Sequence, residues 1–221
     1  MKFYILNKYL ASLSGLFLLL FLTGHLAGNL QLLISESAGA QKQFNEYANF
    51  MSTNPVVKVL SIITYVSIFL HVFVTIVLTI DSKMKRPIKY KKTKSPSSSP
   101  GSKYMGVLGT IILAFVIIHL SNFWFKAKFT NEILKDPYGN KDIYSLVISK
   151  FQHIEHVSIY VFSMLAIFFH TLHGFSSSFQ SLGLVTSKTR KYFTLAGIIY
   201  SLVIPVMFAV IPVYIYFGLN K

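Results

Sequence analysis

Hydrophobic residues in this chain form five long, nearly uninterrupted blocks, and polar residues lie between them. The apolar positions follow neither the period of an amphipathic helix nor that of a half-buried strand. Each block reaches the roughly 18 residues that a helix needs to cross about 30 Å of hydrocarbon. The predicted spans are Tyr9–Ile34, Val56–Ile80, Tyr104–Phe125, His156–Ser177 and Tyr192–Phe217. The pattern predicts an all-α membrane protein of five transmembrane helices, with residues 1–221 forming a single integral membrane domain.

Composition agrees with this class and limits the chemistry. Hydrophobic residues make up 53% of the 221 positions and charged residues only 13%, about half the charged share of a soluble domain. The chain has no cysteine, which excludes disulfides, cluster-binding thiolates and thiolate-bound haem. Any metal must therefore be held by oxygen ligands or by some of the seven histidines.

The charge distribution predicts orientation rather than a nucleic-acid partner. A net charge of +14 would suggest nucleic-acid binding if the basic residues formed one face of a soluble fold. Here the basic residues lie in the segments that connect the apolar blocks. Residues 81–103, between the second and third spans, contain eight of the basic residues. The positive-inside rule makes this segment a basic cytoplasmic loop and places the N-terminus in the cytoplasm. We expect a multi-pass protein of the bacterial cytoplasmic (inner) membrane.

Histidines occur inside four of the five predicted spans. Ionisable side chains at membrane depth are costly and mark functional positions. His25 and His119 lie past the middle of outward-running spans, whereas His71 and His170 lie past the middle of inward-running spans. At 1.5 Å per residue these positions form two pairs at matching depths, in layers about 10 Å apart.

Two imidazoles facing each other at one depth are the ligand set of a six-coordinate haem. With both axial positions filled, haem iron transfers electrons rather than binding oxygen. The four histidine-bearing spans then form a haem-binding four-helix bundle with the fifth helix beside it. Gly24 and Gly28 flank His25 and leave room for a flat macrocycle to approach the helix.

Other interpretations of the same residues remain open. The histidines could line a proton path in a membrane transporter or hydrogen-bond within a packed bundle. Gly24 and Gly28 also have the spacing of a helix-packing seam. His173 lies one turn from His170 and could replace it as a ligand.

Several short motifs, in this order and spacing, resemble a known family. They are Ser14-Gly15-Leu16-Phe17 with Gly24-His25-Leu26, Phe44-Asn45 with Phe50-Met51 and Pro55, Phe69-Leu70-His71, Ile118-His119, and Phe169-His170-Thr171-Leu172-His173-Gly174 ending in Gln180-Ser181-Leu182-Gly183. Together they resemble the single-polypeptide, two-haem cytochrome b membrane anchor of succinate dehydrogenases and fumarate reductases. The resemblance covers nearly the whole chain.

The resemblance implies a subunit of a succinate:quinone oxidoreductase in the respiratory chain. It implies that His25 and His119 hold a distal haem b, and that His71 and His170 hold a proximal haem b. The spacing to the closing glycine favours His170 over His173. A flavoprotein and an iron–sulfur subunit would bind the cytoplasmic face and exchange electrons with a membrane quinone, typically menaquinone. This chain itself would hold no flavin and no dicarboxylate site.

Two further residues follow from the resemblance. Glu46, nine residues before Pro55, matches an acidic residue that handles the quinol proton near the distal haem; a solvated loop acid is the alternative. Ser12 matches a contact to a proximal-haem propionate. A different quinol-oxidising cytochrome with bis-histidine haem b also remains open.

Overall fold

The chain is helical almost throughout in the computed structural model, which describes residues 2–84 and 100–219. The helices are α1 (Lys2–Asn29), α2 (Ala40–Thr53), α3 (Pro55–Met84), α4 (Pro100–His119), α5 (Lys126–Phe129), α6 (Ile143–Phe151), α7 (Ile154–Ser181) and α8 (Arg190–Tyr216), with 3₁₀ turns η1 (Leu30–Leu33) and η2 (Glu36–Ala38) and a π-helical segment η3 (Leu120–Phe125). Five helical stretches of the described residues are long and apolar enough to cross a membrane. The predicted fold class is confirmed, and the helices indicate a multi-pass membrane protein.

The five predicted spans match α1, α3, α4 with η3, α7 and α8, but the helices run further than the apolar blocks. Helix α3 continues to Met84 and α4 begins at Pro100, so both helices run a few residues into the predicted 81–103 loop. The reason is that hydropathy detects only the hydrocarbon core, whereas a helix also crosses the polar interfacial layers. Residues 85–99, with most of the loop's basic residues, lie outside the described part of the chain.

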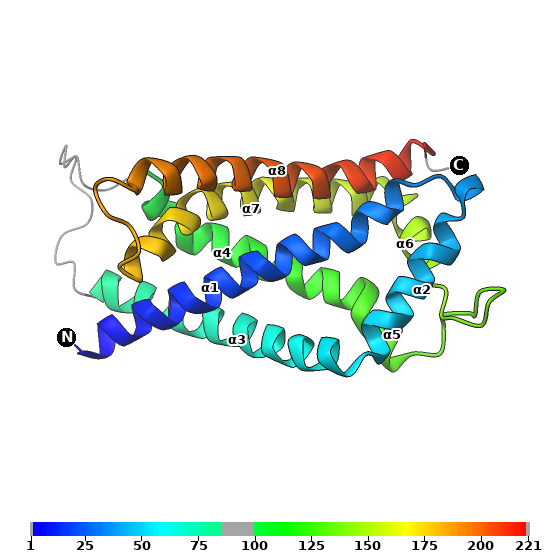
Figure 1. Ribbon diagram of the computed structural model, residues 1–221, viewed down its shortest axis with the longest axis horizontal. Coiled ribbons are helices and arrows are strands. Elements are labelled where there is room, and N and C mark those ends of the chain that lie inside the picture. The colour runs from blue at the N-terminus through cyan, green and yellow to red at the C-terminus, as the bar shows by residue number, and fades with distance from the viewer. Residues whose placement is uncertain (1, 85–99, 220–221) are drawn as a thin grey trace.

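The five spans pack as a bundle in which α1 crosses diagonally over the others (Figure 1). Helix α1 packs against α3 and α7, α7 lies alongside α8, and α4 packs on α7. Contact between α3 and α4 is sparse. Only 6% of the apolar window of the third span is buried, against 39% for the fourth, so α4 is the span least covered by the protein's own side chains. The two termini lie at opposite ends of the bundle.

Local sequence explains where the spanning helices begin and end. Pro55 disfavours helical backbone at the preceding residue, and Asn54 is extended with ψ of 127°. The Asn54 carboxamide oxygen then accepts the backbone N–H groups of Val56 and Val57 at 2.9 and 3.3 Å, which caps α3. Helix α7 ends at Ser181, and Gly183, two residues later, has a φ of 76°, the left-handed conformation that glycine adopts without strain.

One end of the bundle is covered by α2, α6 and the irregular segment 130–142, which together we call the cap (right side of Figure 1). Buried Asn45 on α2 ties it together: its amide donates to Asp136 at 3.1 Å and to Asp142 at 3.0 Å. The Asn45 carbonyl oxygen accepts the backbone N–H of Tyr144 at 2.9 Å. Much of the apolar core lies next to this network, formed by residues such as Leu32, Phe44 and Ile215. The cap is therefore a folded part of the structure.

Stability of the cap should depend on pH through Asp142. Burial opposes ionisation of this carboxyl, but hydrogen bonds from Asn45, Ser145 and Gln41 outweigh it and lower its pKa. A pKa that is lower in the folded state stabilises the fold above the unfolded-state value, and this contribution is lost as pH falls below about 4. We expect D142N, which keeps an N-cap residue before α6, to reduce the loss of thermal stability between neutral and acidic pH.

Thermal unfolding in detergent across this pH range measures the effect. Glu36→Gln is the control, because Glu36 is exposed on η2. Equal acid sensitivity in D142N, the control and the unsubstituted protein would contradict the assignment to Asp142.

Candidate functional site

Four membrane-spanning helices contribute one histidine each, and these four histidines form two separate pairs inside the bundle. His25 on α1 faces His119 on α4, with ring centroids 5.7 Å apart and ring planes at 84°. His71 on α3 faces His170 on α7, with centroids 6.4 Å apart and planes at 72°. These are the two pairings that depth predicts; what they bind stays a prediction. Helix α8 supplies no histidine.

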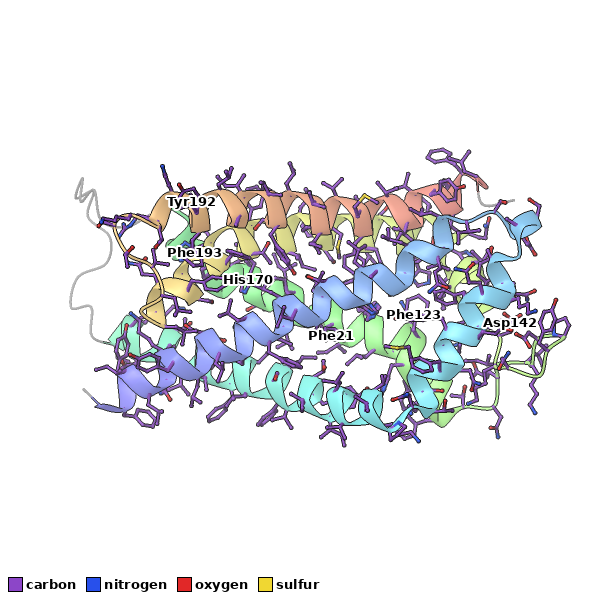
Figure 2. All side chains as sticks on the ribbon, viewed as in Figure 1. Phe21, Phe123, Asp142, His170, Tyr192 and Phe193 are labelled. Atoms are coloured by element: carbon purple, nitrogen blue, oxygen red, sulfur yellow. The ribbon has the colours of Figure 1, made fainter. Side chains whose placement is uncertain are left out.

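The two pairs lie at different levels along the bundle axis. On α1, a Cβ built on Gly15 would approach His71 Cε1 to 3.2 Å, and His25 follows ten residues later. On α4, a Cβ built on Gly109 would lie 4.0 Å from His170 Cε1, and His119 follows ten residues later. Ten residues correspond to about 15 Å of helix. In Figure 2, His170 lies towards the N-terminal end, whereas Phe123, a neighbour of His119, lies towards the cap.

Aromatic rings surround the His25–His119 pair. Phe21 stacks on His25 at a centroid distance of 5.4 Å, and Phe208 of α8 lies at 5.7 Å. His119 has three aromatic neighbours at 5.5 to 5.9 Å, which are Phe115, Phe123 and Tyr160. The pair therefore sits in an apolar environment, with the Tyr160 hydroxyl 3.3 Å from His119 Nδ1.

The Nδ1 atoms of the four histidines have different partners. His71 Nδ1 lies 3.1 Å from the carbonyl oxygen of Ala11 and 3.2 Å from Ser14 Oγ. His25 Nδ1 lies 3.4 Å from Asn29 Nδ2. His170 Nδ1 is buried with no hydrogen-bond partner.

The Nε2 atoms, in contrast, are unused in all four rings. Among the hydrogen bonds of the described residues, those that reach these four rings end on Nδ1. Ligating histidines typically bind a metal through one nitrogen while the other hydrogen-bonds a neighbour. His71 has an acceptor for that second N–H in the Ala11 carbonyl, and His119 can have one in the Tyr160 hydroxyl. The neighbour of His25 Nδ1 is instead an amide donor, and His170 Nδ1 has no partner.

The spacing within the His71–His170 pair fits two ligands on opposite sides of one metal. An imidazole nitrogen lies about 2.0–2.1 Å from a bound metal and about 1.1 Å from its own ring centre, so two opposed imidazoles have centroids about 6.3 Å apart. The 6.4 Å of the His71–His170 pair matches this value, whereas the 5.7 Å of the His25–His119 pair is shorter, so those two rings would have to move apart to hold a metal between them. In the described part of the chain, no three histidine or acidic side chains gather into a metal site. Each pair therefore offers at most two histidine ligands, and which group they hold stays a prediction.

A π-helical segment, Leu120–Phe125, begins directly after His119. Such segments are rare, shift the side-chain register by one residue, and frequently occur at functional sites. Here the segment carries Phe123, which packs on His119, and Trp124, whose indole N–H donates to Tyr65 of α3 at 2.9 Å. It thereby links α3 to the third span, although α3 and α4 otherwise make sparse contact.

The predicted glycines and the second α7 histidine lie in different surroundings. No atom lies within 4 Å of a Cβ built on Gly24, so the space beside it is open. Gly28 instead packs against the Tyr47 ring of α2, where a Cβ would clash with the phenol. His170 makes the ring contact with His71.

The two looser candidates are not brought next to the histidine rings. Glu46 lies on the exposed face of α2 and pairs with Lys42 at 3.9 Å. Ser12 is buried on α1, but it is Ser14, two residues later, whose hydroxyl reaches His71. The roles predicted for Glu46 and Ser12 stay predictions.

Sequence reasoning did not place Ser14, Gly15, Gly109 or Tyr160, among other neighbours, beside the histidine rings. A signal for the glycines was present, since Gly15 and Gly109 each precede a histidine of an outward-running span by ten residues. Ser14 and Tyr160 carried no comparable signal, because their role depends on how neighbouring helices are rotated. Comparison with protein-family models, curated proteins and solved structures finds no match to this chain.

Proposed function

We propose that this protein is the membrane-anchor cytochrome b subunit of a succinate dehydrogenase or fumarate reductase complex. In this role it carries electrons between an iron–sulfur subunit and a membrane quinone, typically menaquinone.

 The main support for this proposal is that four helices bring their histidines together as two pairs, with ring centroids 5.7 and 6.4 Å apart.

In this proposal the four histidine rings would be the axial ligands of two haems. His25 and His119 would hold one haem b through Nε2, and His71 and His170 the other. Six-coordinate haem iron supplies one-electron transfer without an open position for oxygen. The aromatic rings around His25 and His119 would exclude water from the cofactor at that level.

The assignment to this class of complex rests on the sequence motifs. Their order agrees with the two-haem anchors of succinate dehydrogenases and fumarate reductases, and the ring pairs join the same helices that the resemblance implies. The excess of basic residues on the N-terminal side favours a cytoplasmic N-terminus in a bacterial inner membrane. We place the flavoprotein and iron–sulfur partners on that side, and the quinone in the membrane.

Purification in mild detergent tests the proposal. We expect a reduced-minus-oxidised spectrum of b type, about two haems per chain by pyridine haemochrome assay, and co-purification of a flavoprotein and an iron–sulfur protein. If the protein contains two haems but co-purifies with other partners, it is a cytochrome b, and the succinate dehydrogenase or fumarate reductase assignment is overturned. A folded protein without haem would overturn the whole proposal.

A further inference from the structure

We propose that Ser14 and the Ala11 carbonyl, both on α1, fix the tautomer and orientation of His71 and thereby set the reduction potential of the haem between α3 and α7. This inference rests on the proposed function for the haem, but the tautomer itself does not. Ser14 acts through His71, so it is a positioning residue.

The Ala11 carbonyl determines where the His71 proton resides. A carbonyl oxygen can only accept a hydrogen bond, and it lies 3.1 Å from His71 Nδ1. His71 Nδ1 must therefore carry the hydrogen, which leaves Nε2 as the bare nitrogen in a neutral ring. The Ala11 carbonyl thus favours the tautomer that can bind a metal through Nε2.

The Ser14 hydroxyl reinforces this arrangement. Ser14 Oγ lies 2.7 Å from the Leu10 carbonyl oxygen, to which it donates within its own helix. Its lone pairs then face His71 Nδ1 at 3.2 Å, so the N–H is shared between the serine and Ala11. Gly15 completes the contact, because a side chain there would press on the His71 ring at 3.2 Å.

The other three histidines are held differently. His119 faces a tyrosine hydroxyl and His25 faces an asparagine amide, and a hydroxyl can either donate or accept. His170, the partner of His71, has a buried Nδ1 with no hydrogen-bond partner. Within the His71–His170 pair, only His71 is therefore oriented by a hydrogen bond to Nδ1.

When Nδ1–H donates a hydrogen bond to an acceptor, the imidazole becomes a more basic ligand through Nε2. A more basic axial ligand stabilises the oxidised iron, so removing the Ser14 acceptor should raise the midpoint potential of this haem. The haem between His25 and His119 should keep its potential, because Ser14 lies at the other level of the bundle.

Redox titration of Ser14→Ala in the purified complex tests this inference. Ser163→Ala is the matched control, because Ser163 is also buried in a spanning helix and its hydroxyl bonds only to the backbone of its own helix, at Ile159. We expect an upward shift of one midpoint in Ser14→Ala and unchanged midpoints in Ser163→Ala. Ser14→Cys, which keeps a weaker acceptor, should give an intermediate shift. An unchanged or lowered midpoint in Ser14→Ala would overturn the inference.

Nitrogen-15 NMR of labelled histidines separates this inference from the proposed function. The His71 signal, assigned by its loss in His71→Gln, should report a protonated Nδ1 whether or not haem is bound. A protonated Nε2 with a bare Nδ1 would overturn the inference. Absence of haem in the unsubstituted protein, with Nδ1 protonated, would instead overturn only the proposed function and the dependent potential.

Discussion

Replacement of His25 with alanine is expected to remove one of two haems from the purified protein, and replacement of His71 to remove the other. His119→Ala should reproduce the spectrum of His25→Ala, and His170→Ala that of His71→Ala. The reason is that each ring has one opposed partner, at 5.7 or 6.4 Å between centroids. Haem content per chain and the low-temperature α-band of each variant measure the result.

The grouping of the four variants is the sharper part of this prediction. Depth and structure both pair His25 with His119, so variants in different pairs should give different residual spectra. His153→Ala is the control, because His153 is exposed at the start of α7 and contacts Glu155 at 3.8 Å. A control that loses haem as fully as the four variants, or four variants that each retain both haems, would refute the ligand assignment.

Replacement of Asn45 with alanine should be the most destabilising single change in the cap. It removes the donors to Asp136 and Asp142 and leaves the Tyr144 backbone N–H without its acceptor. Asn45 is fully buried and Asp136 nearly so, and a buried polar group left without a partner costs about 1–3 kcal/mol, more when it is charged. We expect the free energy of unfolding to fall by about 2–4 kcal/mol.

Asn49→Ala provides the matched control on the same helix. Asn49 is exposed, and surface changes away from special features usually alter stability by less than about 0.5 kcal/mol. Denaturant unfolding in detergent compares the two variants. Equal stability losses in both would show that the Asn45 network contributes little.

The amino-acid sequence by itself was sufficient for the spans and for the histidine pairing. The spans can be predicted because an apolar block of this length is unfavourable in water and long enough to cross the bilayer. In lipid, a helix forms all its backbone hydrogen bonds within the segment itself. The pairing follows because rise per residue converts sequence position into depth, which brought His25 level with His119 and His71 level with His170.

Only the tertiary structure decided which neighbours the histidines have. Whether Ser12 or Ser14 reaches His71, and whether Gly28 meets a macrocycle or Tyr47, depends on the rotation and tilt of α1 against α3 and α2. Hydropathy carries no rotational information for a helix that is apolar on all sides. The Asn45 network was equally hidden, because its partners lie more than 90 residues away in the chain and meet only when α2 folds over the end of the bundle.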